Sequence, residues 1–569
     1  MNVHMRTFLG NMLLTAILLG CGDERHTEAP PAVASAAATS SPWFTDVSDT
    51  SGIDFTWVSG HHEQFLMPEI IGGGVALLDI DGDGLLDIYF VQGGYLDPNA
   101  PAAQGSPPTN RMYRNAGDWS FEDVTDTSGA ADAGYGQGVA TGDIDNDGDV
   151  DIYITNVGPN TLLLNDGTGV FTDVSAQAGV AHPGWGASAS FLDANADGLL
   201  DLFVTNYVNW NAETELECFS VTGQDYCSPK NYDSPAIDVL YLNQGNGTFK
   251  DVSRAAGITA ATGNGLGIAC VDFDGDGRID IFVANDGTQD QLWHNRGNGT
   301  FEDIGLLAGC ALDDEGKAKA GMGVTVSDTD DDGDIDLLVC NLTGESDSFF
   351  RNEGSYFVDA TAAVGLKSTS KPFTRFGMGW MDFNNDGFLD LYEANGRVLR
   401  NTVAEGTDPY AQENMILQGS ASGRFSEVLP RGGVGVPQSF TSRAAAFGDL
   451  DNDGAVDIVV VNRDAPATVL RNTHTQDGHW IRFRALDASG RDALGAVLTA
   501  KIGQRNLTRP VLTGYSYLAA NDPRVHLGLG PATAVDEVTI RWLDGDTERF
   551  GPFDSNATHE IRRGEGRTN

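Results

Sequence analysis

One acidic stretch, Asp79-Ile-Asp-Gly-Asp-Gly-Leu-Leu-Asp87, recurs six more times along the chain. Each copy places an oxygen-bearing side chain at positions 1, 3 and 5, glycine at position 6 and aspartate at position 9. Alternate residues of a tightly curved loop face one centre, and oxygen ligands in that number suit Ca2+ better than Mg2+. The spacing therefore predicts up to seven Ca2+ sites.

The ligands are predicted at positions 1, 3, 5, 7 and 9, with position 7 unrestricted because only its backbone carbonyl would be used. They are Asp79, Asp81, Asp83, Leu85 and Asp87; Asp143, Asp145, Asp147, Asp149 and Asp151; Asp193, Asn195, Asp197, Leu199 and Asp201; Asp272, Asp274, Asp276, Arg278 and Asp280; Asp328, Asp330, Asp332, Asp334 and Asp336; Asp382, Asn384, Asp386, Phe388 and Asp390; Asp449, Asp451, Asp453, Ala455 and Asp457. Asn195 and Asn384 remove one charge each, so we expect weaker binding in the third and sixth loops.

Short β-branched and aromatic runs flank these loops, such as Val75–Leu78 before the first and Ile88–Val91 after it. Such runs are typical of strands rather than of EF-hand helices. A second motif, Phe-x-Asp-Val or a close variant, precedes each loop, as at Phe121–Val124. One period therefore predicts four antiparallel strands.

Seven four-stranded units predict a β-propeller over residues 43–472. We expect Phe44–Val47 to pair with Thr468–Arg471 and so close the ring. Long insertions at 92–110 and 207–237 are either binding segments or plain surface loops. Residues 473–569 have alternating strands without an acidic loop, and their acidic and basic residues balance. The predicted fold class is thus all-β: a seven-bladed propeller with calcium loops and a small C-terminal β-sandwich-like domain.

The N-terminus carries targeting signals. Residues 1–20 have a basic start and an apolar core too short to span a bilayer, ending in Leu18-Leu-Gly-Cys21. This end resembles a bacterial lipobox, which implies a lipoprotein signal peptide and lipidation of Cys21; an ordinary signal peptide is the alternative. Residues 21–42, mostly Ala, Pro, Ser and Thr, predict a flexible tether. We expect a lipid-anchored, extracytoplasmic protein at the outer membrane or cell surface.

Two cysteines of the second insertion, Cys218 and Cys227, predict a disulfide in an exported chain. Cys270 and Cys340 lie on strand-like runs and are expected to be buried. The sequence leaves the pairing of these two residues and Cys310 open.

The formal net charge is −47, which argues against a nucleic-acid partner. The chain has no Gly-x-Ser-x-Gly, HExxH or P-loop motif. The candidate catalytic residues lie beside the expected inner strands: His61, His62, Glu69, Arg375 and Arg443, with Tyr135, Trp185 and Asn264 near them. His61, His62 and Glu69 could hold a transition metal, although adjacent strand residues face opposite sides. Arg375 and Arg443 could clamp an anion, or simply pair with nearby acids.

The seven loops resemble FG-GAP/VCBS repeats of the integrin α-subunit type. The tail resembles an ASPIC/UnbV domain through Gly514-Tyr-Ser-Tyr-Leu518, His526-Leu-Gly-Leu-Gly530 and Trp542-Leu-Asp-Gly545. The combination is similar to the cartilage acidic protein-like family and covers nearly everything after residue 43. It implies a calcium-binding extracellular propeller. The integrin Phe-Gly…Gly-Ala-Pro signature is absent, so integrin-like recognition does not carry over.

Two functions stay open. The first is a non-catalytic, monomeric binding or adhesion scaffold for an extracellular or periplasmic protein or glycan, tethered to the membrane through Cys21. The second is an enzyme of the lyase, dehydratase or cyclase type at the propeller channel, with or without a further transition metal. A histidine, an arginine and a tyrosine within hydrogen-bond reach would favour the enzyme. An apolar patch on the insertions beside a water-filled channel would favour the scaffold.

Overall fold

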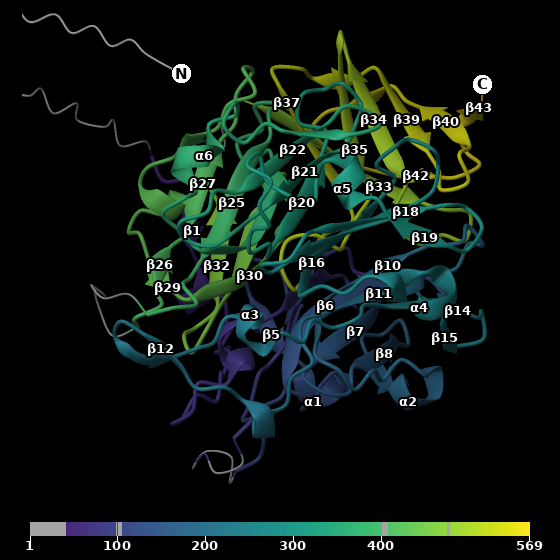
Figure 1. The fold of residues 1–569 in the computed structure, drawn as a ribbon. Helices are drawn as coiled ribbons and strands as arrows, with labels where there is room; N and C mark the ends of the chain where they lie inside the picture. The colour runs from purple at the N-terminus through teal and green to yellow at the C-terminus, as the bar shows by residue number, and fades with distance from the viewer. Residues whose placement is uncertain (1–40, 98–99, 101–104, 401–407, 475–477, 569) are drawn as a thin grey trace, which may run out of the picture. The chain divides into compact units, whose positions relative to one another are not determined.

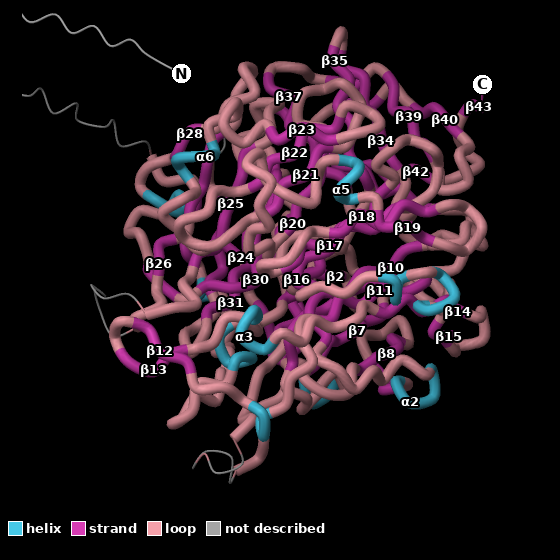
Figure 2. The backbone as a smooth tube through the Cα atoms, viewed as in Figure 1, coloured by secondary structure: helices cyan, strands magenta, loops and turns pink. Residues whose placement is uncertain are grey.

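The computed structural model describes residues 41–97, 100, 105–400, 408–474 and 478–568. The predicted signal peptide and the lipidation site Cys21 lie outside these residues, as does nearly all of the tether. Strands dominate the described chain, and its helices are single turns (Figure 2). No helix among the described residues has the length and apolarity needed to cross a membrane. The all-β prediction is confirmed.

Four-stranded antiparallel sheets repeat along the chain (Figure 1). In sequence order they are β2 (Val75–Leu78), β3 (Asp87–Phe90), β4 (Arg111–Asn115) and β5 (Phe121–Asp123); β6 (Gly136–Gly142), β7 (Asp151–Asn156), β8 (Thr161–Asn165) and β9 (Phe171–Asp173); β10 (Gly186–Leu192), β11 (Asp201–Asn206), β14 (Val239–Asn243) and β15 (Phe249–Asp251); β16 (Gly265–Val271), β17 (Asp280–Asn285), β18 (Gln291–Asn295) and β19 (Phe301–Asp303); β20 (Val324–Ser327), β21 (Asp336–Val339), β22 (Ser348–Asn352) and β23 (Phe357–Asp359); β24 (Arg375–Met381), β25 (Asp390–Asn395), β27 (Met415–Gln418) and β28 (Ser426–Glu427); and β30 (Ser442–Gly448), β31 (Asp457–Asn462), β32 (Thr468–Asn472) and β1 (Phe44–Asp46).

The first strands of these sheets contact one another in a closed sequence: β2, β6, β10, β16, β20, β24, β30 and β2 again. The last of these sheets joins the two ends of the propeller segment, because β1 pairs with β32, Phe44 opposite Asn472. The predicted closing pair is thereby confirmed. First and second strands are buried along their whole length, which explains why they read as continuous apolar runs.

The Phe-x-Asp-Val motif forms the outer strand and a capped turn. Phe121 is buried, and Asp123 Oδ1 accepts a hydrogen bond of 3.0 Å from the backbone N–H of Thr125. That bond starts the helical turn α1 (Thr125–Ser128), which ends at Gly129 in the left-handed region. The same arrangement recurs in α2 (Ser175–Ala178), α4 (Ser253–Ala256) and α5 (Gly305–Ala308). The motif therefore encodes both an edge strand and its exit.

In six of the seven sheets a buried asparagine at the end of the third strand links neighbouring sheets. The side-chain amide of Asn243 donates to the carbonyl of Ile144, position 2 of the preceding sheet's acidic loop, at 2.7 Å, and to that of Leu200 at 3.1 Å. Equivalent links to position 2 join Asn115 to Leu450, Asn165 to Ile80, Asn295 to Ala194, Asn352 to Phe273 and Asn472 to Phe383. In the remaining sheet Gly419 takes this place. These hydrogen bonds connect each sheet to the preceding one around the ring.

We predict that Asn243→Ala lowers the free energy of unfolding by about 2–4 kcal/mol, because two buried carbonyls lose their donor. Asn246→Ala is the matched control in the same turn, since Asn246 is exposed and accepts only from Thr248. We expect the control to cost less than about 1 kcal/mol. Equal unfolding midpoints of the two variants in denaturant would contradict the linking role.

The C-terminal strands form sheets of their own. One contains β33 (His479–Leu486), β37 (Val525–Gly530) and β42 (Thr558–Arg562). The other contains β34 (Val497–Ile502), β35 (Arg505–Pro510), β39 (Glu537–Arg541), β40 (Thr547–Phe550) and β43 (Arg567–Thr568). The predicted boundary at residue 473 stays a prediction.

One C-terminal segment, residues 513–521, enters the ring of first strands. Its strand β36 (Ala519–Ala520) pairs in parallel with β2. Ser516 exchanges backbone hydrogen bonds of 2.9 and 2.6 Å with Val324 on β20, and its hydroxyl donates to the carbonyl of Ala445 on β30 at 2.7 Å. Tyr517 and Leu518 are buried in the same apolar cluster as residues of β2, β10 and β24. We call residues 513–521 the plug. Because the plug packs among the first strands, the water-filled channel that would have favoured the scaffold is not what this part of the ring shows.

Candidate functional site

The seven acidic loops all connect the first strand of a sheet to its second strand, so they lie at one end of the first strands. In the first loop, Asp79 Oδ2 accepts the backbone N–H of Gly84 at 2.9 Å, and Gly84 has a φ of 86°. The same bond from position 6 to position 1 recurs at Gly148, Gly198, Gly277, Gly333, Gly387 and Gly454. The glycine is required because the left-handed backbone turns its N–H onto the first aspartate.

Carboxylate oxygens converge in these loops. Asp79, Asp81 and Asp87 each offer an oxygen within 4.8 Å of the others. The sets Asp143, Asp145 and Asp151; Asp272, Asp274 and Asp276; and Asp328, Asp330 and Asp332 do the same. In each of these four loops the structure thus brings together three of the side chains that the spacing singled out, and these aspartate donors are all oxygen. Such a donor set fits a hard divalent cation.

The ninth-position aspartate has a structural role as well as a possible ligand role. Asp87 accepts the backbone N–H of Ile80 at 2.9 Å through Oδ2 and that of Asn115 at 2.7 Å through Oδ1. The six other ninth-position aspartates make the equivalent pair of bonds. Burial raises the pKa of Asp87 to about 7 and that of Asp151 to about 8. These carboxylates therefore lie in a site that disfavours uncompensated charge.

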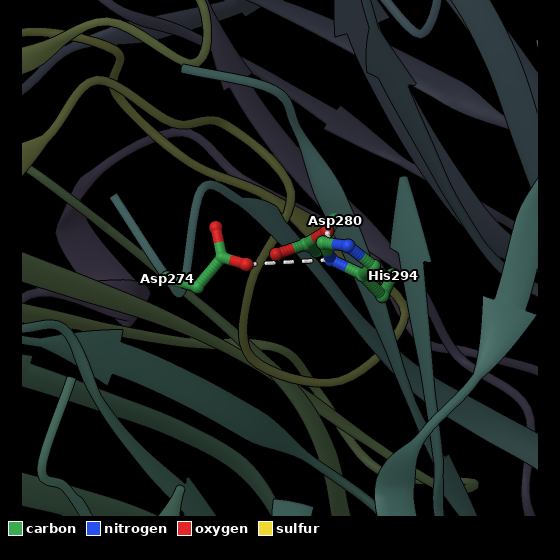
Figure 3. Close-up of side chains that lie close together, drawn as sticks. All are labelled: Asp274, Asp280 and His294. Carbon is green, nitrogen blue, oxygen red and sulfur yellow. Dashed lines mark hydrogen bonds and ion pairs between the residues drawn. The ribbon is translucent and has the colours of Figure 1, made fainter. Parts of the chain in front are cut away.

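In some loops a basic side chain, which was not predicted, lies beside the aspartates. His294 on β18 places Nδ1 3.2 Å from Asp280 Oδ1 and 3.5 Å from Asp274 Oδ2 (Figure 3). At the same strand position, Arg114, Arg351 and Arg471 face the third-position aspartates of their own loops at 3.9, 3.2 and 3.1 Å. Leu164, Leu242 and Gln418 occupy it in the other sheets. A basic residue directly before the linking asparagine is the sequence feature that could have predicted this contact with the acidic loop.

A second polar cluster lies near the starts of the first strands. His61 Nδ1 is 2.8 Å from Glu69 Oε2, and the Tyr226 hydroxyl donates to the same oxygen at 3.1 Å. Arg463 donates from Nη2 to the Tyr226 oxygen at 2.8 Å and from Nε to the Glu69 carbonyl at 2.7 Å. Burial raises the pKa of Glu69, partly opposed by His61. We call these four residues the Glu69 cluster.

The Glu69 cluster differs from the predicted metal set. His62 points elsewhere, with Nδ1 3.8 Å from Asp97 Oδ2, because adjacent residues diverge. Tyr226 comes from the 207–237 insertion, where Cys218 and Cys227 form a disulfide. Neither Tyr226 nor Arg463 was predicted, because both are far from Glu69 in sequence. The local sequence feature that could have pointed to Tyr226 is its position next to Cys227 in the 207–237 insertion.

The two predicted anion-binding arginines do not form a site. Arg375 is buried, with Nε 2.6 Å from Asp347 Oδ1. Arg443 is buried against the Phe376 ring and donates to the carbonyls of Ile70, Gly396 and Arg397. Burial lowers the pKa of Arg443 to about 9. Both guanidiniums are used inside the protein, so the anion-clamp hypothesis is wrong.

The remaining predicted residues are structural. The Tyr135 hydroxyl donates to the Ser59 carbonyl at 2.8 Å, and the Asn264 amide donates to the Asp286 carbonyl at 2.8 Å. Trp185 packs edge-on against Tyr207. Cys270, Cys310 and Cys340 are buried and unpaired among the described residues.

A model of the FG-GAP-like repeat matches residues 79–154, 143–204, 225–283, 272–339 and 328–393, which cover more than half of the chain. The chain belongs to the FG-GAP-like repeat family. A model described as ASPIC and UnbV matches residues 486–568. The expected combination of FG-GAP repeats with an ASPIC/UnbV domain is confirmed.

Relatives of this FG-GAP protein include cartilage acidic protein 1 of Homo sapiens, 27% identical over 324 residues, which are 53% of this chain and 44% of that protein. The Xenopus tropicalis protein is 27% identical over 320 residues, 53% of this chain and 45% of its own length. The chain thus spans less than half the length of these relatives. Among solved structures, the BP39L lectin from Burkholderia pseudomallei has a TM-score of 0.44 and 12% identity, covering 72% of this chain and 98% of the lectin.

The C-terminal strands contact the acidic loops through arginines. Arg482 Nη1 is 2.8 Å from Asp449 Oδ2, Arg505 Nε is 2.8 Å from Asp331 Oδ2, and Arg541 pairs with Asp272. Asp449 and Asp272 are first positions of their loops. The acidic ends of the FG-GAP sheets are therefore both candidate cation sites and the docking face for the C-terminal sheets.

Proposed function

We propose that this FG-GAP protein is a Ca2+-binding, non-catalytic binding scaffold, held at the cell envelope through Cys21 and recognising a protein or glycan outside the cytoplasm. The loop residues at positions 1, 3, 5 and 9 would hold the ions, with the position 7 carbonyl. Bound Ca2+ would neutralise the carboxylates and fix the turns. The all-oxygen convergence in the loops supports this assignment.

The observation that carries the scaffold hypothesis is an exposed apolar hairpin on the second insertion. Phe219 on β12 (Cys218–Ser220) and Val221 in the turn to β13 (Gly223–Asp225) are 71% and 90% exposed. The Cys218–Cys227 disulfide fixes the base of this hairpin. A rigidly presented apolar tip on an insertion suits recognition, because little entropy is lost on binding.

The test uses a glycan array and purified envelope preparations, probed with tag-purified protein lacking residues 1–42. We expect binding that disappears with chelator and falls at least tenfold in Phe219→Ser/Val221→Ser. Leu306→Ser/Leu307→Ser is the matched control, because those residues are 60% and 86% exposed away from the insertion. Unchanged binding in the insertion variant would overturn the role of this hairpin.

A second candidate function is favoured by the Glu69 cluster, which brings a histidine, a tyrosine and an arginine within hydrogen-bond reach. Glu69 would hold a proton for a lyase, dehydratase or cyclase reaction, because burial raises its pKa. A transition metal on His61 and Glu69 would be an additional electrophile. Stoichiometric zinc, copper or iron in purified protein, lost in Glu69→Gln, would favour this enzyme over the scaffold.

The calcium assignment predicts a pH effect that appears only after chelation. Burial raises the pKa of Asp151 and Asp280 to about 8 and of Asp201 and Asp336 to about 7, above those of the unfolded chain. The calcium-free fold is therefore favoured where these groups are protonated, and it loses stability as pH rises through 7 to 8. We expect the melting temperature in chelator to fall by roughly 5 °C between pH 6 and pH 8.5. Saturating Ca2+ should remove this dependence; a melting temperature that rises with pH in chelator would contradict it.

A further inference from the structure

A cavity of about 530 Å³ lies between the FG-GAP sheets and the ASPIC/UnbV strands. Its floor is formed by the ends of β2 and β6, including Asp79 and Asp143, and its wall by β33 and β42. The volume is within the usual range for small-molecule sites, which is roughly 300–1,000 Å³. The cavity is separate from the Glu69 cluster and from the insertion hairpin, neither of which contributes to its lining.

Four arginines line this cavity: Arg482, Arg484, Arg491 and Arg524. Arg491 is 4% exposed, and its Nε donates to Asp487 at 2.8 Å. Arg524 bonds through Nε to Asp522 at 2.8 Å. One further nitrogen on each, Arg491 Nη1 and Arg524 Nη2, is buried without a hydrogen-bond partner among the described residues. Both side chains line the cavity, where an acceptor on a ligand would satisfy these donors.

The rest of the lining suits a hydroxylated ring. Trp480 presents an aromatic side chain, and Asn452, Asn556 and Thr558 add polar groups. Aromatic faces pack against the C–H face of a sugar ring, and amides and hydroxyls bond its hydroxyl groups. Guanidinium groups bind a carboxylate in a fixed two-point geometry. Together these groups are suited to a ring that carries both hydroxyls and a carboxylate.

Carboxylates on the lining limit the ligand's charge. Asp492 and Asp522 are paired with Arg484 and Arg524 at 2.9 and 2.8 Å, and Glu560 is exposed at the mouth. Asp79 and Asp143 belong to the first two acidic loops. Arg482 and Arg491 are paired in turn with Asp449 and Asp487, at 2.8 Å each, so the lining arginines and their carboxylate partners balance. With Ca2+ held by Asp79 and Asp143, Arg491 Nη1 and Arg524 Nη2, unpartnered among the described residues, are the donors left for a single carboxylate. This step rests on the proposed function.

We propose that the cavity binds a sugar acid of one or two residues, with its carboxylate on Arg491 and Arg524 and its ring against Trp480. This names a ligand class for the glycan-binding scaffold and gives the ASPIC/UnbV segment a part in recognition. The C-terminal sheets are then half of the binding site.

The test is isothermal titration calorimetry of the calcium-loaded protein with glucuronate, glucose and acetate. We expect glucuronate to bind at least tenfold more tightly than either glucose or acetate. Arg491→Gln and Arg524→Gln should each weaken glucuronate at least tenfold. Arg549→Gln, an exposed arginine on β40 outside the cavity, should leave the affinity unchanged. Equal affinities for the three probes, or full affinity in both cavity variants, would overturn the proposal.

The arginine variants could lose glucuronate affinity because they misfold, so a variant expected to gain affinity is also needed. Glu560→Gln removes an exposed negative charge from the cavity mouth and should tighten glucuronate about threefold; an unchanged or weaker affinity would count against the proposal. Calcium content measured in the same samples separates the two hypotheses. If the protein contains calcium but does not bind glucuronate, only the proposed sugar-acid site is overturned. Protein purified without chelator that holds no calcium overturns the proposed function itself.

Discussion

Chelation of Ca2+ is expected to lower the melting temperature of this protein by roughly 20 °C. Each ion that binds only the folded state adds about 2.7 kcal/mol when its free concentration is one hundred times Kd. Seven loops repeat the same arrangement, so their contributions accumulate. Without cations, the carboxylates of positions 1, 3 and 9 in the first two loops, and of positions 1, 3 and 5 in the fourth and fifth, lie within 4.8 Å of one another and repel. Differential scanning fluorimetry with and without chelator measures the shift.

The metal and the loops are tested by two matched comparisons. Adding back Ca2+ should restore the melting temperature, whereas an equal concentration of Mg2+ should restore little of it, because Mg2+ keeps its own water ligands. Asp145→Asn removes one negative charge at a third-position ligand and should reduce both the bound calcium and the chelator-sensitive shift. Asp166→Asn changes the same charge on a fully exposed residue outside the loops and should do neither. A bound calcium content below about three per chain would refute the assignment.

The repeated sheets could be predicted because each repeat contains the local sequence features that define its strands and turns. Phe121, Asp123 and Gly129 define an edge strand, a cap and an exit within nine residues, and the same types recur down the chain. The closing pair of Phe44 and Asn472 followed because two partial repeats remained at the ends of the propeller segment. Local patterns repeated many times outweigh the ambiguity of any one of them.

The linking asparagines show where local interpretation falls short. Asn165 and Asn243 stand directly before glycine-containing turns, which is typical of hairpins, yet their amides bond to carbonyls of the preceding sheet. A turn and an inter-sheet link require the same residue at the same place, so the spacing alone could not separate them. The Glu69 cluster was missed in part for a related reason, because Glu69, Tyr226 and Arg463 meet only when the ring closes.

The plug was beyond prediction because Gly514–Leu518 shows neither strand nor helix periodicity. Its place follows from a space that only the assembled ring creates. The ring needs a filler, since first strands that meet around an axis leave a gap that their own small side chains do not close. Gly267 and Gly323 bring backbones so close that an added Cβ would lie 2.0 and 1.9 Å from a neighbouring carbonyl oxygen. Because these glycines have no side chain, they do not occupy the centre of the ring, and the plug occupies it instead.

Replacing Tyr517 by alanine is therefore expected to lower the free energy of unfolding by about 3–5 kcal/mol, the usual range for deleting a buried aromatic side chain. Tyr517 is fully buried, its ring centre is 4.9 Å from that of Phe376, and its hydroxyl donates to the Ile71 carbonyl at 2.9 Å. Tyr517→Phe keeps the ring and loses only the hydrogen bond, so about 1 kcal/mol is expected. Tyr356→Ala, at a residue that is 51% exposed, should cost less than either.

The order of these three variants tests the plug more sharply than any one value. If the plug fastens the ASPIC/UnbV sheets to the FG-GAP ring, Tyr517→Ala should also speed limited proteolysis of the C-terminal sheets, whereas Tyr517→Phe should not. A loss of stability without faster cleavage would mean that Tyr517 fills the ring but does not hold the C-terminal sheets in place. Equal unfolding midpoints for Tyr517→Ala and Tyr356→Ala would exclude the plug as a stabilising element, because a filled ring centre cannot lose its central side chain without cost.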